Sequence, residues 1–259
     1  MKKRFLLPLL FLSMIFPFFA DAKNLVYTNS FDFYTIDNLE ITLTYEQLQI
    51  SRIYGNELLV EIGSNNIKKI PEVSCDQETL KITSKEEKYK RGDKCTVYLY
   101  IPQDFQAQSI TIRNVSGNIS ADFLKAQNAV LLSNVSGRTD IGSCQTELFT
   151  CLSVSGNTSL QKIMVDYFEF GSTSGNIFAE LERVPFATSM ISNISGKTQV
   201  YFPKNSNFEI LAFTISGSIK MPDSQNQKNT PHNFHSIIGD GGTSLSVTSV
   251  SGKIEFTQY

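Results

Sequence analysis

Two histidines are the residues of this sequence that could most directly carry chemistry. His232 and His235 lie close together and Asp240 follows, so the three side chains could be proposed as ligands of a metal ion. They stand in a polar stretch that has no helical context and no clustered further ligand. We therefore interpret them as surface-loop residues and expect neither a metal site nor a cofactor.

A serine stands directly before a glycine at seven places, and serine becomes a nucleophile when a base lies beside it. Seven equivalent nucleophiles in a periodic position would make little sense, so we interpret the serines as structural. The sequence shows no paired carboxylates of the glycosidase kind, no nucleophile elbow and no phosphate-binding glycine loop. We expect no catalytic residue and no enzyme. Residues distant in sequence could still meet across coils, as in β-helix enzymes that cut polysaccharides.

The elements that position these serines are copies of one short phrase, first seen as Asn114-Val115-Ser116-Gly117-Asn118-Ile119. Its turn glycines are Gly117, Gly137, Gly156, Gly175, Gly196, Gly217 and Gly252. Successive glycines are 20, 19, 19, 21, 21 and 35 residues apart. A period near twenty residues with a constant small-polar, β-branched, Ser, Gly sequence is typical of a solenoid of stacked coils.

Alternation around each glycine predicts two short strands per coil. Apolar or β-branched residues stand at two and four positions after the glycine, and largely apolar residues at five and seven positions before it. The β-branched residue two positions before the glycine breaks the alternation, so we place a corner there. Glycine suits such a corner because it reaches positive φ without steric cost.

Equivalent residues of successive coils should stack in columns. The column three positions before the glycine contains only small hydrogen-bonding residues, and we expect it to form a ladder along the corner. Its members are Asn114, Asn134, Ser153, Ser172, Asn193, Thr214 and Ser249.

The chain divides into three segments. Residues 1–22 read as a signal peptide, because Lys2, Lys3 and Arg4 precede an apolar run and Ala20-Asp21-Ala22 fits a cleavage site. An uncleaved membrane anchor is the alternative, although the run is short for a span. Residues 23–102 form an N-terminal β region of irregular first coils or a cap. Residues 103–259 form the regular solenoid, with a polar insertion at about 221–240.

We expect the insertion to be a surface loop. The last coil, which ends near Phe256 and Tyr259, leaves a parallel edge that must be shielded. Our hypothesis is that the insertion folds over that edge.

Net charge is formally −2, and the basic residues are scattered. Nucleic acid and anionic lipid are therefore not expected partners. No later stretch is long and apolar enough to cross a bilayer, so we expect no transmembrane segment in the mature chain.

Four cysteines in an exported chain permit two disulfides. Cys75 and Cys95 flank a charged, hairpin-like stretch, and Cys144 and Cys151 lie across a turn within one coil. We expect both pairings as candidates. For Cys151, which lies in an inward column, a buried free thiol is the alternative.

The serial Val-Ser-Gly-Asn-Ile phrase, the Val97-Tyr98-Leu99-Tyr100-Ile101-Pro102 segment and Gly239-Asp240-Gly241-Gly242 resemble the bacterial putative-adhesin repeat family. These exported proteins are relatives of the autotransporter-adhesin head GIN domains. The resemblance covers about residues 25–259 and implies an all-β, right-handed parallel β-solenoid with about 19–21 residues per coil. It supplies no catalytic residue.

Three functions follow as expectations. The first is a non-catalytic, adhesin-like scaffold that binds a protein or glycan at the cell envelope through a solenoid face. The second is a periplasmic envelope-maintenance or stress-response factor. The third is a glycan-cleaving enzyme. Each places the mature chain in the periplasm or at the cell surface.

Overall fold

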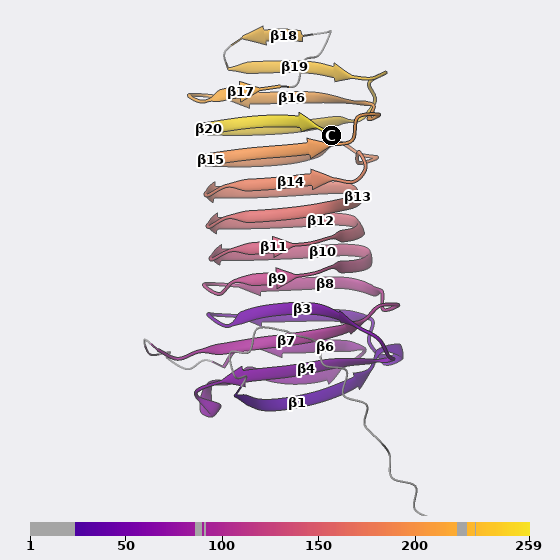
Figure 1. Ribbon diagram of the computed structural model, residues 1–259, viewed down its shortest axis with the longest axis vertical. Coiled ribbons are helices and arrows are strands. Elements are labelled where there is room, and N and C mark those ends of the chain that lie inside the picture. The colour runs from indigo at the N-terminus through magenta and orange to yellow at the C-terminus, as the bar shows by residue number, and fades with distance from the viewer. Residues whose placement is uncertain (1–23, 86–89, 91, 222–226, 231) are drawn as a thin grey trace, which may run out of the picture.

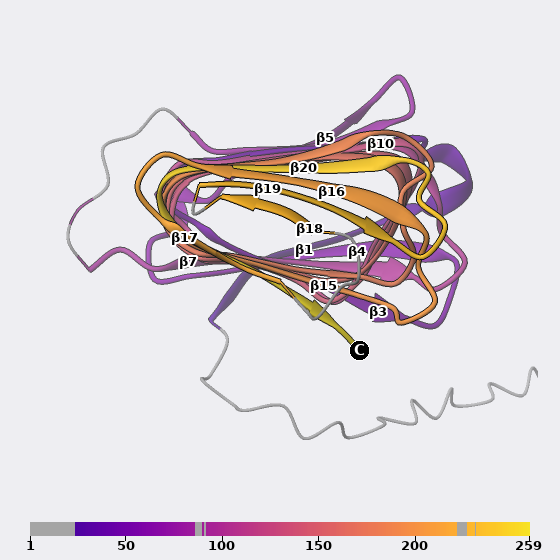
Figure 2. The same ribbon diagram turned by 90° about the horizontal axis from the view of Figure 1, so that it is seen from above.

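The computed structural model describes residues 24–85, 90, 92–221, 227–230 and 232–259. Over these residues the chain winds into a column of stacked β-strands (Figure 1). Seen down the column, the coils form a flattened ring with two facing walls (Figure 2). The all-β solenoid predicted from the glycine period is confirmed.

Wall A and wall B are the two sides of this ring. From base to top, wall A begins with β5 (Glu72–Asp76), β6 (Thr79–Thr83), β2 (Asn38–Leu43) and β8 (Ala107–Asn114). It continues with the later parts of β10 (Leu124–Ser136), β12 (Cys144–Ser155) and β13 (Thr158–Ser174) and the earlier parts of β15 (Ser189–Phe202) and β20 (Ser244–Gln258). It ends with β16 (Phe208–Thr214), β19 (Asn233–Ile238) and β18 (Gln227–Thr230). Wall B contains β1 (Leu25–Asp32), β4 (Glu57–Ser64), β7 (Cys95–Pro102), β3 (Gln47–Ile53), β9 (Ile119–Ala121), β11 (Thr139–Ile141), the first part of β13, β14 (Ile177–Leu181), the later parts of β15 and β20, and β17 (Ser218–Lys220). Two 3-10 turns, η1 (Phe33–Thr35) and η2 (Ile67–Lys69), lie in the N-terminal region.

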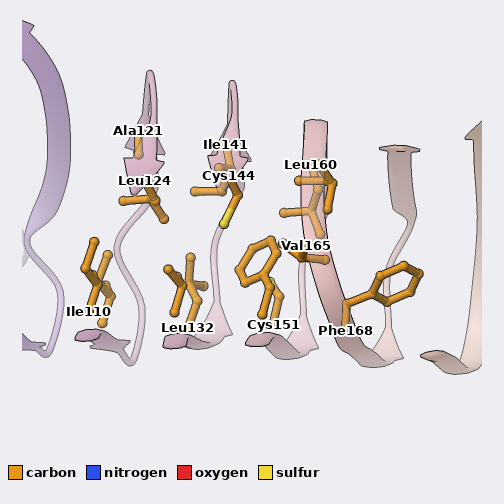
Figure 3. Packing of buried hydrophobic residues seen from close by; sticks show 14 of the residues in the cluster. Ile110, Ala121, Leu124, Leu132, Ile141, Cys144, Cys151, Leu160, Val165 and Phe168 are labelled. Carbon is orange, nitrogen blue, oxygen red and sulfur yellow. The ribbon is translucent and has the colours of Figure 1, made fainter. Parts of the chain in front are cut away.

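The interior is filled by the columns that alternation predicts. Ile119, Thr139 and Thr158 pair strand to strand in register and are buried. Side chains of both walls point into the space between them (Figure 3). Large aromatic side chains fill its widest part: the rings of Phe168 and Phe170 stack with centroids 4.3 Å apart. The burial of these columns supplies the main stabilisation of the fold.

The order of the coils in space differs from their order in the chain. β20, the last strand, lies between β15 and β16 and is parallel to both (Figure 1). At the other end β2 and β3, which form the first coil, lie between the coil of β6 and β7 and the coil of β8 and β9. The first coil and the last strand are thus each inserted one coil inward from where simple winding would leave them, whereas β1 lies at the edge of the base.

Antiparallel strands close the column at each end. At the base β4 pairs with β7, β1 pairs with β4, and β5 pairs with β6. The N-terminal region therefore combines regular coils with a cap. At the top β19 pairs with β16, and β18 pairs with β19. Such pairing ends the parallel edge that a solenoid would otherwise expose.

The expectation of a surface loop at 221–240 is therefore wrong in its larger part. The insertion forms the hairpin of β18 and β19, because alternating residues such as Phe234, Ser236 and Ile238 face inward and are buried. The hairpin covers a strand edge, as we expected. The covered edge belongs to β16 and not to the last strand.

Close approach of the coils explains the glycines better than backbone angle does. Gly137, Gly156, Gly175 and Gly196 have positive φ, but Gly117, Gly217 and Gly252 do not. At all seven, a Cβ atom would lie closer than 3.0 Å to a backbone carbonyl oxygen of the neighbouring coil. Any side chain here would collide with the backbone, which cannot yield, so the expectation based on φ alone was incomplete.

The glycine column ends on Glu46 in the first coil. The Glu46 carbonyl oxygen lies against Gly117 and accepts a hydrogen bond from the Asn114 side chain at 3.0 Å. The buried Glu46 carboxylate accepts hydrogen bonds from the backbone N–H groups of Thr44 and Tyr45 and, at 2.6 Å, from the Ser84 hydroxyl. This carboxylate therefore supports the turn on which the column begins.

The predicted polar ladder runs beside the glycines, and its members are buried. The Asn134 amide donates to the Gly117 carbonyl at 3.2 Å and to the Thr139 hydroxyl at 3.2 Å. Asn193 makes the same two bonds, to Gly175 and Thr198. The asparagines of this column thus join one coil to the next at the corner. The hydroxyls of Ser172, Thr214 and Ser249 are buried without a hydrogen-bond partner, so the predicted ladder forms only at the asparagines.

Candidate functional surface

From β8 to β16, the outer face of wall A is almost uncharged; below it, β2 and β6 carry Glu40 and Lys81 at outward positions. The almost uncharged part is formed by four rows of residues, which stand two, four, six and eight positions before each turn glycine and point away from the interior. In spatial order, the row nearest the corner contains Val115, Val135, Val154, Thr173, Ile194, Val250 and Ile215.

These corner residues are solvent-exposed although nearly all are apolar. Val115 is 48% exposed, Val154 49% and Ile215 59%. The neighbouring rows add further exposed apolar side chains: Leu131, Leu152, Met190, Leu211 and Phe213. Exposed apolar side chains that gather along one face in this way mark interaction surfaces.

Charge is sparse on this face. Among the positions of the four rows, the charged side chains are Arg113 near the base, Glu169 at mid-height and Glu209 near the top. The imidazole of His235 on the next strand lies 3.5 Å from the Glu209 carboxylate. The rest of the face presents aliphatic, aromatic, serine and threonine side chains.

A notch interrupts the face near its middle. Gly171 contributes no side chain, and the end of the Leu152 side chain leans over it. The resulting hollow has a volume of about 270 Å³ and is lined by Leu152, Gly171, Thr173, Met190 and Ile194 among others. The hollow is open to solvent and its lining is mixed, since Glu169 and Ser192 stand beside the apolar side chains.

Wall B has the opposite character on its outer face. Arg138 pairs with Asp140 at 2.6 Å, and Glu255 accepts from both Lys197 and Lys253. Exposed asparagines bind the next coil, as where the Asn118 side chain accepts from the Arg138 backbone N–H at 2.8 Å. Its polar groups are thus largely engaged with one another.

The repeat and its geometry agree with a known family. A family model described as Toastrack DUF4097 matches residues 36–183, from just before β2 to just after β14. This chain belongs to the Toastrack family. The match includes the inserted first coil and four copies of the glycine phrase. It agrees with the resemblance to the putative-adhesin repeat family.

Solved structures are similar to this Toastrack chain at low sequence identity, and the first of the two below shares its fold. A putative adhesin from Bacteroides fragilis NCTC 9343 is 18% identical with a TM-score of 0.55, over 89% of this chain and 96% of that one. A putative lipid binding protein from Parabacteroides distasonis ATCC 8503 is 13% identical with a TM-score of 0.47, over 89% and 96%. No curated protein matches the chain.

The two histidines do not come together with Asp240 at a metal site. His235 lies on β19 beside Glu209, and His232 lies in the turn before that strand. Over the residues that the structure describes, no three His, Cys, Asp or Glu side chains gather closely enough to hold a metal ion.

The two expected disulfides are absent, since all four cysteines are free thiols. Cys75 is exposed on the base strand β5 of wall A, whereas Cys95 is buried on β7 of wall B, so the two lie on different walls. Cys144 and Cys151 are both buried on the single strand β12 and pair with different residues of β13. Burial raises the pKa of Cys95 and Cys151 to about 12 and that of Cys144 well above its usual range. The alternative of a buried free thiol at Cys151 is the observed one.

The outward column of wall B was the expected location of any cross-coil catalytic acids. Its members, in spatial order, are Ser120, Asp140, Ser159, Phe178, Gln199, Glu255 and Lys220. Three coils lie between Asp140 and Glu255 in this order, and each carboxylate has its own cationic partner. The arrangement is that of structural ion pairs.

Sequence reasoning missed the outer face of wall A. We used the β-branched residue before each Ser-Gly only as a sign of a corner, and alternation gave no reason to expect it in solvent. The available signal was that this corner position is apolar in six of the seven copies. A corner residue that contacts only water has no need of an apolar side chain, so this regularity indicates a contact surface.

Proposed function

We propose that this chain is an exported, non-catalytic scaffold of the cell envelope that associates with a partner through the outer face of wall A. The observation that carries the proposal is the long, nearly uncharged row of exposed valine and isoleucine side chains on that face. Soluble monomers seldom keep such a surface uncovered. The structurally similar protein from Bacteroides fragilis is described as a putative adhesin, which also supports a binding role.

Export is supported by the N-terminal sequence. The basic start, apolar run and Ala20-Asp21-Ala22 site lie in residues 1–23, outside the described part of the structure. Elsewhere in the described chain, no helix has the length and apolarity needed to cross a membrane. Cell fractionation with mass spectrometry should find a mature chain that begins at Lys23 in the envelope or extracellular fraction. Retention of the full-length chain in the cytoplasm would contradict the proposal.

Association through wall A can be tested in cells by site-specific photocrosslinking. A photoreactive side chain at Thr150 lies on the outer face of wall A, and one at Ser159 lies on wall B of the same coil. We expect the photoreactive side chain at Thr150 to give discrete crosslinked products, whatever the mass of the partner, and the one at Ser159 to give few. Absence of adducts at Thr150, or equal adducts at both positions, would refute the assignment of the surface.

The non-catalytic part has a separate test. Purified protein incubated with peptidoglycan or envelope polysaccharide should release no reducing ends. Turnover that disappears in Asp140→Asn or Glu255→Gln would revive the enzyme alternative.

A further inference from the structure

We infer that the partner seated on the outer face of wall A is a second copy of this chain, packed face to face about a two-fold axis parallel to the strands. The inference rests on the proposed function, since it names the occupant of that surface. Two observations carry it: the distribution of large and small residues along the rows, and the size of the face.

The axis passes through the central coil of the seven, which contains Gly171, Thr173 and Gly175. A two-fold axis along the strands reverses the order of the coils and keeps each row opposite itself. Each residue therefore faces, in the other copy, the residue of the same row that lies the same number of coils from the central coil in the opposite direction. Interfaces of this isologous kind require a surface that is complementary to itself.

The row four positions before the glycines has this property. Gly171 faces Gly171, and Leu152 on one side faces the small Ser192 on the other. At the ends of the row Arg113 faces Phe213, a cation over an aromatic ring. Leu152 of each copy thereby meets the small Ser192 of the other, beside the hollow at Gly171 on the axis.

The neighbouring row, six positions before the glycines, repeats the pattern. Met190 faces Thr150, and Leu131 faces Ser246. In each pair a large apolar side chain meets a small one. Two sheets that pack face to face at about 10 Å need this alternation, because their side chains must share a single layer.

The corner row places apolar side chains against apolar side chains. Val154 faces Ile194 and Val135 faces Val250, with Thr173 on the axis. All of them are exposed in the single chain and would lose their contact with water in the pair.

The area also suits a stable dimer. Seven strands at ~4.8 Å and four alternate residues at ~6.7 Å give a face of about 900 Å² per copy. The pair would bury on the order of 1,800 Å², which lies in the range of stable protein–protein interfaces. In a dimer with this axis, the charged outer face of wall B remains exposed to water in both copies.

Glu169 is the one unfavourable element. It stands at mid-height in the central coil, so the two copies bring their Glu169 carboxylates toward each other. Like charges in an interface weaken association, so removal of this charge should strengthen the dimer. A nonspecific adhesive surface would not respond to this single position in that way.

Sedimentation equilibrium of the purified mature chain tests the inference. We expect a dimer at micromolar concentration, a rise in Kd of roughly 100-fold for Val154→Asp, and an unchanged Kd for the wall B control Ser159→Asp. Glu169→Gln should lower Kd by about fivefold or more. Circular dichroism and melting temperature establish that each variant is folded.

Crosslinking locates the axis independently of affinity. In a Cys75→Ser background, Thr173→Cys should give a dimer with a short bismaleimide, and Ser159→Cys should not. A wild-type chain that is monomeric at about 100 µM, or a dimer that Val154→Asp and Ser159→Asp affect equally, would overturn the inference. If the purified chain is monomeric while Thr150 still gives adducts in cells, the proposed function stands and the second copy is excluded. If the dimer forms in solution but Thr150 gives no adducts in cells, the chain does not associate through wall A at the cell envelope, which refutes the proposed function and the inference that rests on it.

Discussion

The carbonyl oxygen of Gly252 lies where a Cβ atom on Gly217 would have to stand. Gly252 in turn lies against Gly196, so the last glycine phrase of the chain is inserted between the fifth and the sixth. The glycine column therefore records the spatial order of the coils directly, and it shows that this order departs from the sequence.

Substitution of the column glycines should separate two sources of strain. Gly156→Ala combines positive φ with a collision against the Gly137 carbonyl, and we expect a loss of about 2–5 kcal/mol of unfolding free energy. Gly55→Ala has a similar φ but open space, and should lose only about 1–2 kcal/mol. Urea denaturation measures both. Equal losses would mean that close approach of the coils contributes nothing.

The buried asparagine ladder should matter more than the exposed asparagines. Asn134→Ala removes two buried hydrogen bonds and leaves the Gly117 carbonyl without this donor, for an expected loss of about 1–3 kcal/mol. Asn157→Ala, at an exposed position where water can replace the amide, should lose well under half as much. Thermal and urea unfolding provide the comparison, and the reverse ranking would disprove the role of the ladder.

Inserted β20 should be among the most protected segments despite being at the end of the chain. Its backbone is bonded to β15 on one side and β16 on the other. We expect hydrogen exchange at residues 245–256 to be slow, and exchange in the edge strand β1 to be faster. Deletion of residues 244–259 should also unprotect β16 and β19. A shortened chain that keeps those strands intact would contradict the insertion.

Thiol reactivity should follow burial. Cys75 is exposed and should react with a thiol reagent in the native protein at pH 8, whereas Cys95, Cys144 and Cys151 should react only after unfolding. Mass spectrometry counts the labels.

The same thiols should make stability fall in alkaline solution. Burial raises the pKa of Cys95 and Cys151 from 9.0 to about 12, so the folded state holds protons that the unfolded state releases. Their contribution is complete below pH 9 and is lost as the pH rises toward 12. Replacing Cys151 with Ala should flatten this part of the pH–stability curve. An unchanged slope would argue against the burial.

An ion pair between coils should give a further pH dependence at the acid end. Side-chain hydrogen bonds from Lys197 and Lys253 lower the pKa of Glu255 from 4.5 to about 2. The stabilisation is present above pH 4.5 and is lost as the pH falls toward 2. Glu255→Gln should lower the melting temperature modestly at pH 7, and the difference from the wild type should vanish near pH 2. A difference that persists there would point to packing instead.

Local patterns predicted the coil well and the order of coils poorly. Alternation around Gly117 and its equivalents identified the inward columns because a half-buried strand imposes that pattern on each residue. The position of β20 depends on which coils pair, and the equivalent residues of all coils are too similar to specify a neighbour. The interruption at 221–240 was visible as a broken period, but Phe234 and Ile238 were not used as evidence for a strand.

The surface was less predictable than the core for a related reason. Corner residues such as Val115 and Ile194 carry the same pattern whether they face a partner or water. Only their measured exposure separates the two cases. The cysteines show the same limit, since an even count permits disulfides but does not place two sulfurs within reach.

The insertion of β20 has a consequence for the order in which the protein can fold. A column wound strictly in chain order could add each coil as soon as that coil had been synthesised. Here the edge of β15 stays unpaired until β20 is present, and the coil that contains β16 cannot pair with the column before then. The upper part of the molecule must therefore complete its folding late, after the residues of β20 have been made.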